Sequence, residues 1–143
     1  MKKILYLIQT SGPGGAEKVM FSIVQGLKDK YKPIVGLLKI GWLYDEFQKA
    51  NVETVLIPHG GSFDIKLIYN IVRIIRKEKI DLIHSHLLDM NFYSSIAAFV
   101  GGIPHIATEH GDVHHATKKY DNKIRLKTML ISLLSKKIVF VSN

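Results

Sequence analysis

Short apolar runs alternate along this chain with segments in which apolar residues recur at helical spacing. The runs ILYLI, PIVGLL, VETVLI, DLIHSH, PHIAT and KIVFV are rich in β-branched and aliphatic residues, so they are predicted strands. Apolar residues spaced i, i+3, i+4 predict helices from Ala16 to Leu27, after a capping Asp64, over 92–100 and over about 118–135. A short helix is also expected between Trp42 and Ala50.

This alternation predicts one α/β domain over residues 1–143. Right-handed crossovers favour a Rossmann-like, doubly wound parallel sheet of about six strands in the order 3-2-1-4-5-6, with helices on both faces. Ligands of such sheets bind at the carboxyl ends of the strands. Polar residues gather at these predicted ends: Gln9 and Thr10, His84 to His86, Thr108 to His110, and Ser142 and Asn143.

The first strand runs into a glycine-rich loop, Ser11-Gly12-Pro13-Gly14-Gly15-Ala16-Glu17, that opens a helix. Unpaired N–H groups and the helix dipole make such a helix N-terminus suited to an anion. The dinucleotide pattern G-x-G-x-x-G fails because its third position is Glu17, and the second strand ends at Lys39 instead of an acidic residue. The loop is either a ligand contact or a tight turn without a ligand.

Histidines cluster near the predicted strand ends. His84 and His86 lie two apart and share a face, and Glu109, His110, Asp112, His114 and His115 follow the fifth strand. No spacing here matches a zinc pattern and cysteine is absent, so no metal site is predicted and His84 is interpreted as a hydrogen-bonded structural histidine. His86 is either structural or part of the cleft.

His110 directly follows a strand and precedes Gly111, which allows close approach to the backbone. An imidazole in this place can donate to a phosphate or a sugar hydroxyl and titrates near neutrality. The alternative is a histidine that caps the loop.

The chain carries a formal net charge of +8, and residues 118–137 contribute seven basic residues against one Asp. Lys119, Lys123 and Lys127 form a stripe four residues apart, beside apolar positions such as Met129 and Ile131. This pattern predicts either a helix that lies on an anionic membrane or the solvated face of a packed helix. Nucleic acid is not a predicted partner, because aromatic residues are not interleaved with these lysines.

Four motifs in order resemble one known family. The family is that of the family 4 glycosyltransferases, which have the GT-B fold. Their first, fourth, fifth and sixth strand regions are similar, in that order, to KILYLIQTSGPGGAEKVMFSIVQGL, DLIHSH, PHIATEHG and KKIVFVSN. The likeness covers essentially the whole chain. It implies the N-terminal, acceptor-side domain of an enzyme that transfers a sugar, with retention, from a nucleotide-sugar to a glycan or lipid-linked acceptor.

The resemblance also implies roles for single residues. Gly14 and Gly15 would line the cleft, and His110 would be the catalytic histidine that contacts the transferred sugar. His86, Glu109 and Gly111 are further candidate substrate-binding residues.

The donor-binding domain of that family is absent from the sequence, so the chain alone is expected to be inactive. No cofactor or metal is implied, because the nucleotide-sugar is a substrate. The expected location is cytoplasmic, peripheral at the inner membrane face. The alternative function is a stand-alone binding module for an anionic glycan or membrane headgroup, whereas a dinucleotide oxidoreductase is disfavoured by Glu17 and Lys39.

Overall fold

The computed structural model describes residues 1–61, 63–111 and 122–141. The strands are β1 (Lys3–Ile8), β2 (Lys32–Leu37), β3 (Glu53–Leu56), β4 (Leu82–His86), β5 (His105–His110) and β6 (Lys137–Val141). The helices are α1 (Gly15–Leu27), α2 (Trp42–Lys49), α3 (Ile65–Glu78), α4 (Leu88–Gly101) and α5 (Asn122–Leu134).

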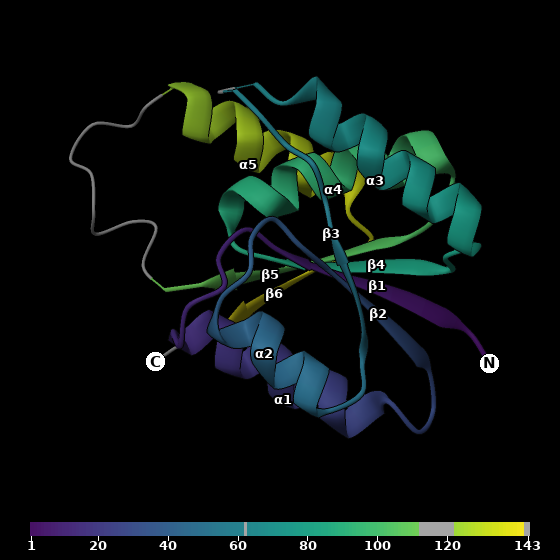
Figure 1. Cartoon of the computed structure of the whole chain (residues 1–143). Coiled ribbons are helices and arrows are strands. Elements are labelled where there is room, and N and C mark those ends of the chain that lie inside the picture. Colours follow the sequence, from purple (N-terminus) through teal and green to yellow (C-terminus); the bar gives the residue numbers. More distant parts are fainter. Residues whose placement is uncertain (62, 112–121, 142–143) are drawn as a thin grey trace.

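The strands form one six-stranded sheet in the order β3-β2-β1-β4-β5-β6. Every neighbouring pair is parallel, which confirms the predicted doubly wound topology. Helices α1 and α2 cover one face of the sheet, and α3, α4 and α5 cover the other (Figure 1). The strand order reverses between β1 and β4, because the chain first adds strands outward to β3 and then outward to β6 on the other side, so the switch point lies beside the carboxyl ends of β1 and β4.

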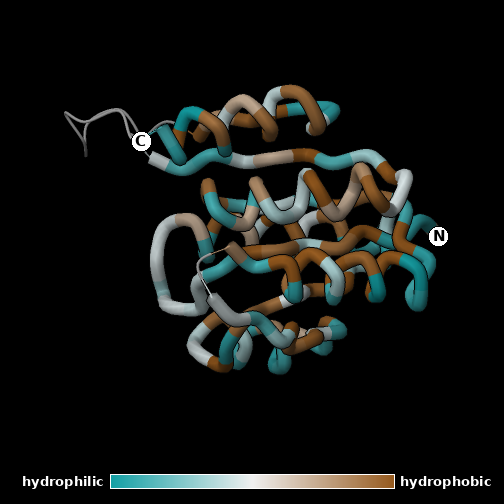
Figure 2. Tube along the Cα trace, turned by 90° about the horizontal axis from the view of Figure 1, so that it is seen from above, coloured by the Kyte–Doolittle hydropathy of each residue, from teal (hydrophilic) through white to brown (hydrophobic). Residues whose placement is uncertain are grey.

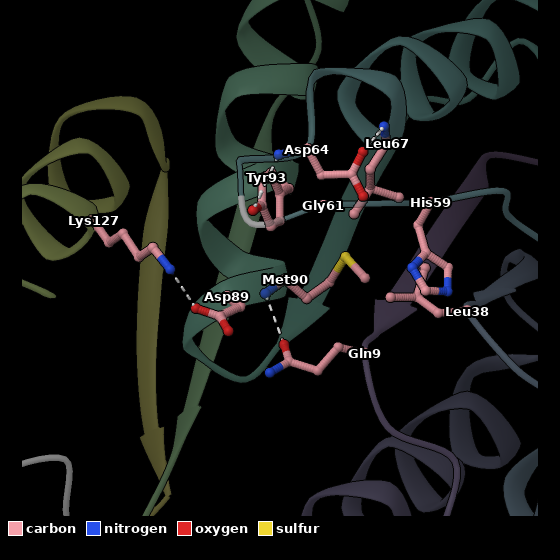
Figure 3. Close-up of a pocket in the computed structure, with 10 residues that line it drawn as sticks. All are labelled: Gln9, Leu38, His59, Gly61, Asp64, Leu67, Asp89, Met90, Tyr93 and Lys127. Atoms are coloured by element: carbon pink, nitrogen blue, oxygen red, sulfur yellow. Dashed lines mark hydrogen bonds and ion pairs between the residues drawn. The ribbon is translucent and has the colours of Figure 1, made fainter. Parts of the chain in front are cut away.

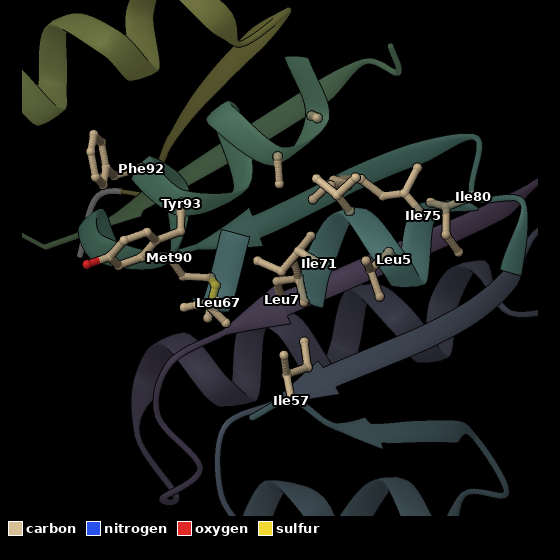
Figure 4. Packing of buried hydrophobic residues seen from close by; sticks show 14 of the residues in the cluster. Leu5, Leu7, Ile57, Leu67, Ile71, Ile75, Ile80, Met90, Phe92 and Tyr93 are labelled. Atoms are coloured by element: carbon tan, nitrogen blue, oxygen red, sulfur yellow. The ribbon is translucent and has the colours of Figure 1, made fainter. Parts of the chain in front are cut away.

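Two hydrophobic layers hold the helices to the sheet. On one face Leu5 and Leu7 of β1 pack beneath Ile71 and Ile75 of α3 (Figure 4). On the other face Tyr6 of β1 packs with residues of α1 and α2. Hydrophobic residues consequently fill the middle of the molecule, and hydrophilic ones gather at its periphery (Figure 2). Burial on both faces explains why the central strands are almost continuously apolar.

Helix ends follow the predicted signals at most positions. The Asp64 side chain accepts a hydrogen bond from Leu67 N at the start of α3, which confirms the predicted N-cap. Gly102 adopts φ +70° and ends α4. Helix α4 begins at Leu88, earlier than the predicted Phe92, because Leu87 turns the chain sharply with φ +73° directly after β4. Of the predicted basic helix, 118–121 lies outside the described residues.

Candidate functional site

The glycine-rich loop brings the chain from β1 to the N-terminus of α1. Gly14 caps the helix in an extended conformation (φ −78°, ψ 173°) without a side-chain cap bond. The buried Glu17 carboxylate lies against Gly14, where an added Cβ would come within 2.5 Å of Oε2. At Gly15 an added Cβ would meet no described atom within 4 Å. The helix dipole favours negative charge at this helix N-terminus, and the buried Glu17 carboxylate already supplies one such charge. The exposed Gly15 beside it leaves the rest of the helix N-terminus open to solvent.

Three histidines form a row on the sheet face that carries Tyr6. The ring centroids of His84 and His86 are 4.6 Å apart, and those of His86 and His110 are 5.1 Å apart. Nε2 of His84 lies 2.8 Å from the Thr108 hydroxyl, and Nδ1 of His86 lies 2.8 Å from Nε2 of His110. The row therefore leads from the sheet interior to His110 at its rim.

The histidine row is held in its neutral form. Burial lowers the pKa of His84 to about 4 and that of His86 to about 2, with smaller contributions from the neighbouring histidines. Partial burial also lowers the pKa of His110, although the nearby Glu17 carboxylate acts in the opposite direction. A neutral imidazole has one N–H donor and one acceptor nitrogen, so the hydrogen bonds within the row decide which nitrogen carries each proton.

Glu109 is held from the opposite face of the sheet. Asn91 of α4 donates from Nδ2 to Glu109 Oε1 at 2.8 Å and to Thr108 O at 3.1 Å. The Ser85 hydroxyl donates to Asn91 Oδ1 at 2.7 Å and lies 2.6 Å from Nε2 of His105. Burial raises the pKa of Glu109, and the Asn91 bond opposes this shift. The result is a buried polar network that fixes a partly buried carboxyl group at the end of β5.

A cavity of about 270 Å³ opens at the same edge of the sheet, between the starts of α3 and α4 (Figure 3). Gln9 Oε1 accepts a 2.8 Å bond from Met90 N at its floor, and Lys127 Nζ donates to Asp89 Oδ1 at 2.7 Å at its side. The lining residues are Gln9, Leu38, His59, Gly61, Asp64, Leu67, Asp89, Met90, Tyr93 and Lys127. Polar side chains of both charges around apolar walls suit a polyhydroxylated ligand.

The structure brings the predicted site residues to one edge but divides them between two faces. His86 and His110 are in direct contact, whereas Glu109 faces α4. Gly111 has φ +78° and lines a smaller cavity of about 130 Å³ together with Glu109 and Phe140. Their roles toward a substrate stay predictions.

The predicted basic stripe lies partly in α5. Lys123 is exposed, Lys127 reaches into the cavity and lies 5.7 Å from the Phe92 ring centroid, and Lys119 lies outside the described residues. Met129, predicted as apolar surface, is 51% exposed, and Ile131 is buried against the core. Among the helices of the described ranges, none combines the length and apolarity needed to cross a bilayer.

The structure also shows whether the histidines and acidic residues near the strand ends are grouped as metal ligands. Within residues 1–61, 63–111 and 122–141, no group of three or more His, Cys, Asp or Glu side chains is arranged to hold a metal ion. Asp112, His114 and His115 lie outside the described residues.

Sequence reasoning missed Asn91 and Asp89, which connect α4 to the site. Asn91 stands between the apolar Met90 and Phe92 and is fully buried, and a polar amide among apolar neighbours is itself a signal, because a buried amide must find partners. Asp89 stands in the first turn of α4, where a carboxylate is favoured, and its pairing with Lys127 spans 38 positions of sequence.

Comparison with known proteins identifies the family. The model of Glycosyltransferase Family 4 matches residues 13–143. The chain belongs to glycosyltransferase family 4. The family 4 match includes Gly14 and Gly15 of the loop, the histidine row and β6, whereas Gly12 and the cavity residue Gln9 precede the matched region.

The chain is similar in sequence to the capsular polysaccharide biosynthesis glycosyltransferase CapH of Staphylococcus aureus. It is 26% identical over 151 aligned positions, which cover 100% of this chain and 41% of CapH. The family 4 chain thus spans less than half the length of this relative.

Solved structures show the same fold. Anabaena Alr3699/HepE in complex with UDP superposes with a TM-score of 0.79 and 22% identity, over 96% of this chain and 37% of that one. Acinetobacter baumannii MurG gives a TM-score of 0.73 and 14% identity, over 100% of this chain and 42% of MurG. These likenesses confirm the Rossmann-like fold of the family 4 chain.

Proposed function

We propose that the chain is the acceptor-side half of a glycosyltransferase that transfers a sugar from a nucleotide-sugar to a glycan or lipid-linked acceptor. The observation that carries the proposal is the carboxyl edge of the sheet in this family 4 chain. There a mixed polar and apolar cavity of about 270 Å³ lies beyond β1 and β4, with Gln9 and Met90 in its lining, at the same edge of the sheet at which β5 ends in Glu109 and His110. The cavity is the acceptor site of this proposal.

The donor is a nucleotide-sugar, and a uridine nucleotide is the first to test. Alr3699/HepE is described in complex with UDP, with UDP and glucose, and with UDP-glucose. The greater part of the donor-binding surface belongs, in this proposal, to the portion of such relatives that this chain does not span. The chain by itself would then bind the acceptor but would not catalyse sugar transfer. CapH supports a role in polysaccharide biosynthesis.

In the reaction, the bond between the sugar anomeric carbon and the nucleotide phosphate oxygen breaks, and a bond to an acceptor hydroxyl oxygen forms. The acceptor hydroxyl proton passes to the departing phosphate oxygen of the nucleotide, which leaves as an anion. We assign transfer with retention of anomeric configuration. His110 contacts the transferred sugar, Gly14 and Gly15 allow close approach of phosphate or acceptor oxygens, and His86, Glu109 and Gly111 complete the rim.

The decisive experiment measures sugar transfer by the full-length protein with a panel of uridine diphosphate sugars. His110→Ala should lower turnover by about a hundredfold or more, as loss of a preorganised hydrogen-bond donor does. Tyr69→Ala, which truncates an exposed ring on α3 outside the cavity, is the control and should leave turnover unchanged. Unchanged turnover in His110→Ala would reject the catalytic assignment, and no transfer from any nucleotide-sugar would reject the function.

A membrane-surface role is favoured by one further observation. On α5 the exposed apolar side chains Leu126, Met129 and Leu133 lie beside the exposed Lys123. Such a surface fits an anionic bilayer at its cytoplasmic side, as a peripheral contact. It also fits the alternative function, a binding module for anionic headgroups.

Vesicle flotation distinguishes these cases. Binding to vesicles with anionic lipid at low salt, weakened by Lys123→Gln but not by Lys18→Gln on α1, would support the membrane contact. Absence of binding at low salt would reject it. Binding without any transferase activity in the full-length protein would favour the binding module.

A further inference from the structure

The contact between His86 and His110 is built into the sheet. His86 is fully buried at the end of β4 and stands opposite Thr108 in the register with β5. His110 follows two residues later on the same face, so the two rings meet diagonally with Nδ1 of His86 2.8 Å from Nε2 of His110. Two paired strands, and not a loop, set this distance.

Only one of the two rings can donate in this hydrogen bond, because both are neutral. Nε2 of His86 is buried and has no partner among the described residues. If His110 donated, the remaining proton of His86 would sit on this buried Nε2 as an orphaned donor. If His86 donates from Nδ1, Nε2 is a bare acceptor instead, and orphaned acceptors are tolerated better than orphaned N–H groups.

We propose that His86 is a positioning residue that donates its Nδ1–H to Nε2 of His110 and so fixes His110 as the tautomer with its own proton on Nδ1. Nδ1 of His110 has no hydrogen-bond partner among the described residues, and the ring is only partly buried. His110 then presents an N–H donor to a ligand oxygen and keeps no lone pair for taking a proton. The role of this N–H donor in sugar transfer rests on the proposed function, whereas the assignment of the tautomer does not depend on it.

The groups that face His110 act in two directions. The negative charge of Glu17 of α1 favours protonation of the His110 ring, whereas burial of the ring opposes it, and His84 and His86 of β4 lie along the row. Protonation of His110 at Nε2 would set two N–H groups against each other across the 2.8 Å contact. The arrangement thus opposes the imidazolium form and supports a neutral donor.

Nitrogen-15 NMR of the histidine-labelled protein tests the tautomer directly, since protonated and bare imidazole nitrogens have well separated shifts. We expect Nδ1–H and bare Nε2 in both His86 and His110. A proton on Nε2 of His110, or averaged shifts at both nitrogens, would overturn the proposal. Thr108→Val, which removes the partner of His84 and leaves the His86–His110 contact, should not change the His110 pattern.

Variants of His86 test the positioning role. The amide of His86→Asn can take the place of the Nδ1–H donor, whereas His86→Leu cannot donate. His110 should keep its Nδ1–H tautomer in the Asn variant and become a mixture in the Leu variant. If His86→Leu does not fold, the wild-type spectrum and the Asn variant still decide the matter.

Turnover of the full-length protein gives a second readout. His86→Leu should lower kcat by about tenfold or more with little change in acceptor KM, and His86→Asn should restore a large part of the loss. Equal losses in both variants would overturn the positioning role. Failure of the proposed function would appear separately, as absence of sugar transfer in a protein that still shows the predicted tautomer.

Discussion

Glu109 and His110 are neighbours in the chain, yet each is anchored on a different face of the sheet. The Glu109 carboxylate accepts a 2.8 Å bond from Asn91 of α4, and the His110 ring lies 2.8 Å from His86 of β4. Successive strand residues point to opposite faces, so one strand end can present a carboxyl group and an imidazole with separate supports. The end of β5 is therefore fixed from both sides of the sheet.

A methyl group at Gly14 should act through Glu17. In Gly14→Ala the new Cβ would lie 2.5 Å from Glu17 Oε2, so the buried carboxylate must move. Gly15→Ala meets no described atom and should stabilise the protein by about 0.4–1 kcal/mol through the unfolded state. Both variants reduce the conformational entropy of the unfolded chain, so the difference between their thermal unfolding temperatures reports the cost of the clash with Glu17 alone. Gly14→Ala as stable as Gly15→Ala would show that Glu17 moves at no cost.

Backbone strain at Leu87 should be measurable. This residue opens α4 with φ +73° and ψ 150°, a region suited to glycine. Leu87→Ala removes the side-chain packing and keeps the strain, whereas Leu87→Gly removes both. We expect the glycine variant to be more stable than the alanine variant by about 1 kcal/mol or more, in chemical denaturation. If Leu87→Ala were the more stable of the two variants, as alanine usually is relative to glycine, the backbone at residue 87 would not be strained.

Stability should fall as the medium is acidified, because buried histidines must stay neutral. Burial lowers the pKa of His105 to about 4 from an ordinary 6.5. The unfolded chain takes up this proton first, so the stabilisation is complete above the unfolded pKa and is lost as the pH falls from about 6.5 towards about 4. For His105 alone the loss at about pH 4.5 is roughly 2–3 kcal/mol. The raised pKa of Glu109 acts in the opposite direction.

Urea denaturation across this pH range measures the effect. His105→Gln keeps an amide near the Ser85 hydroxyl but cannot titrate, so its stability should depend less on pH than that of the wild type. Equal slopes in the two proteins would show that His105 does not contribute to the dependence.

The ion pair of Lys127 and Asp89 should matter more for acceptor binding than for stability. Asp89 is 52% exposed at its side chain, and exposed pairs contribute at most about 1 kcal/mol. Asp89→Asn should therefore change the free energy of unfolding by less than about 1 kcal/mol and raise acceptor KM, with donor KM unchanged. Glu46→Gln, which breaks the Lys49 pair on α2 outside the cavity, is the matched control. A change in donor KM alone would place the cavity on the donor side.

Much of the fold could be predicted from periodicity. The strand order followed from alternating strands and helices, and Asp64 capped α3 as its position before an apolar helical stripe indicated. The start of α4 could not be predicted, because Leu87 is not a residue type expected at positive φ.

The sequence by itself determined which chemical groups reach the carboxyl edge, since alternation places His84 and His86 on one face of β4 and puts Glu109 and His110 on opposite faces of β5. Only the tertiary structure decided which of these groups touch. The His86–His110 contact depends on strand register, and the Asn91–Glu109 and Lys127–Asp89 contacts depend on how α4 and α5 pack on the sheet. Local pattern carries no information on such distances, because they are set by side-chain packing between elements far apart in the chain.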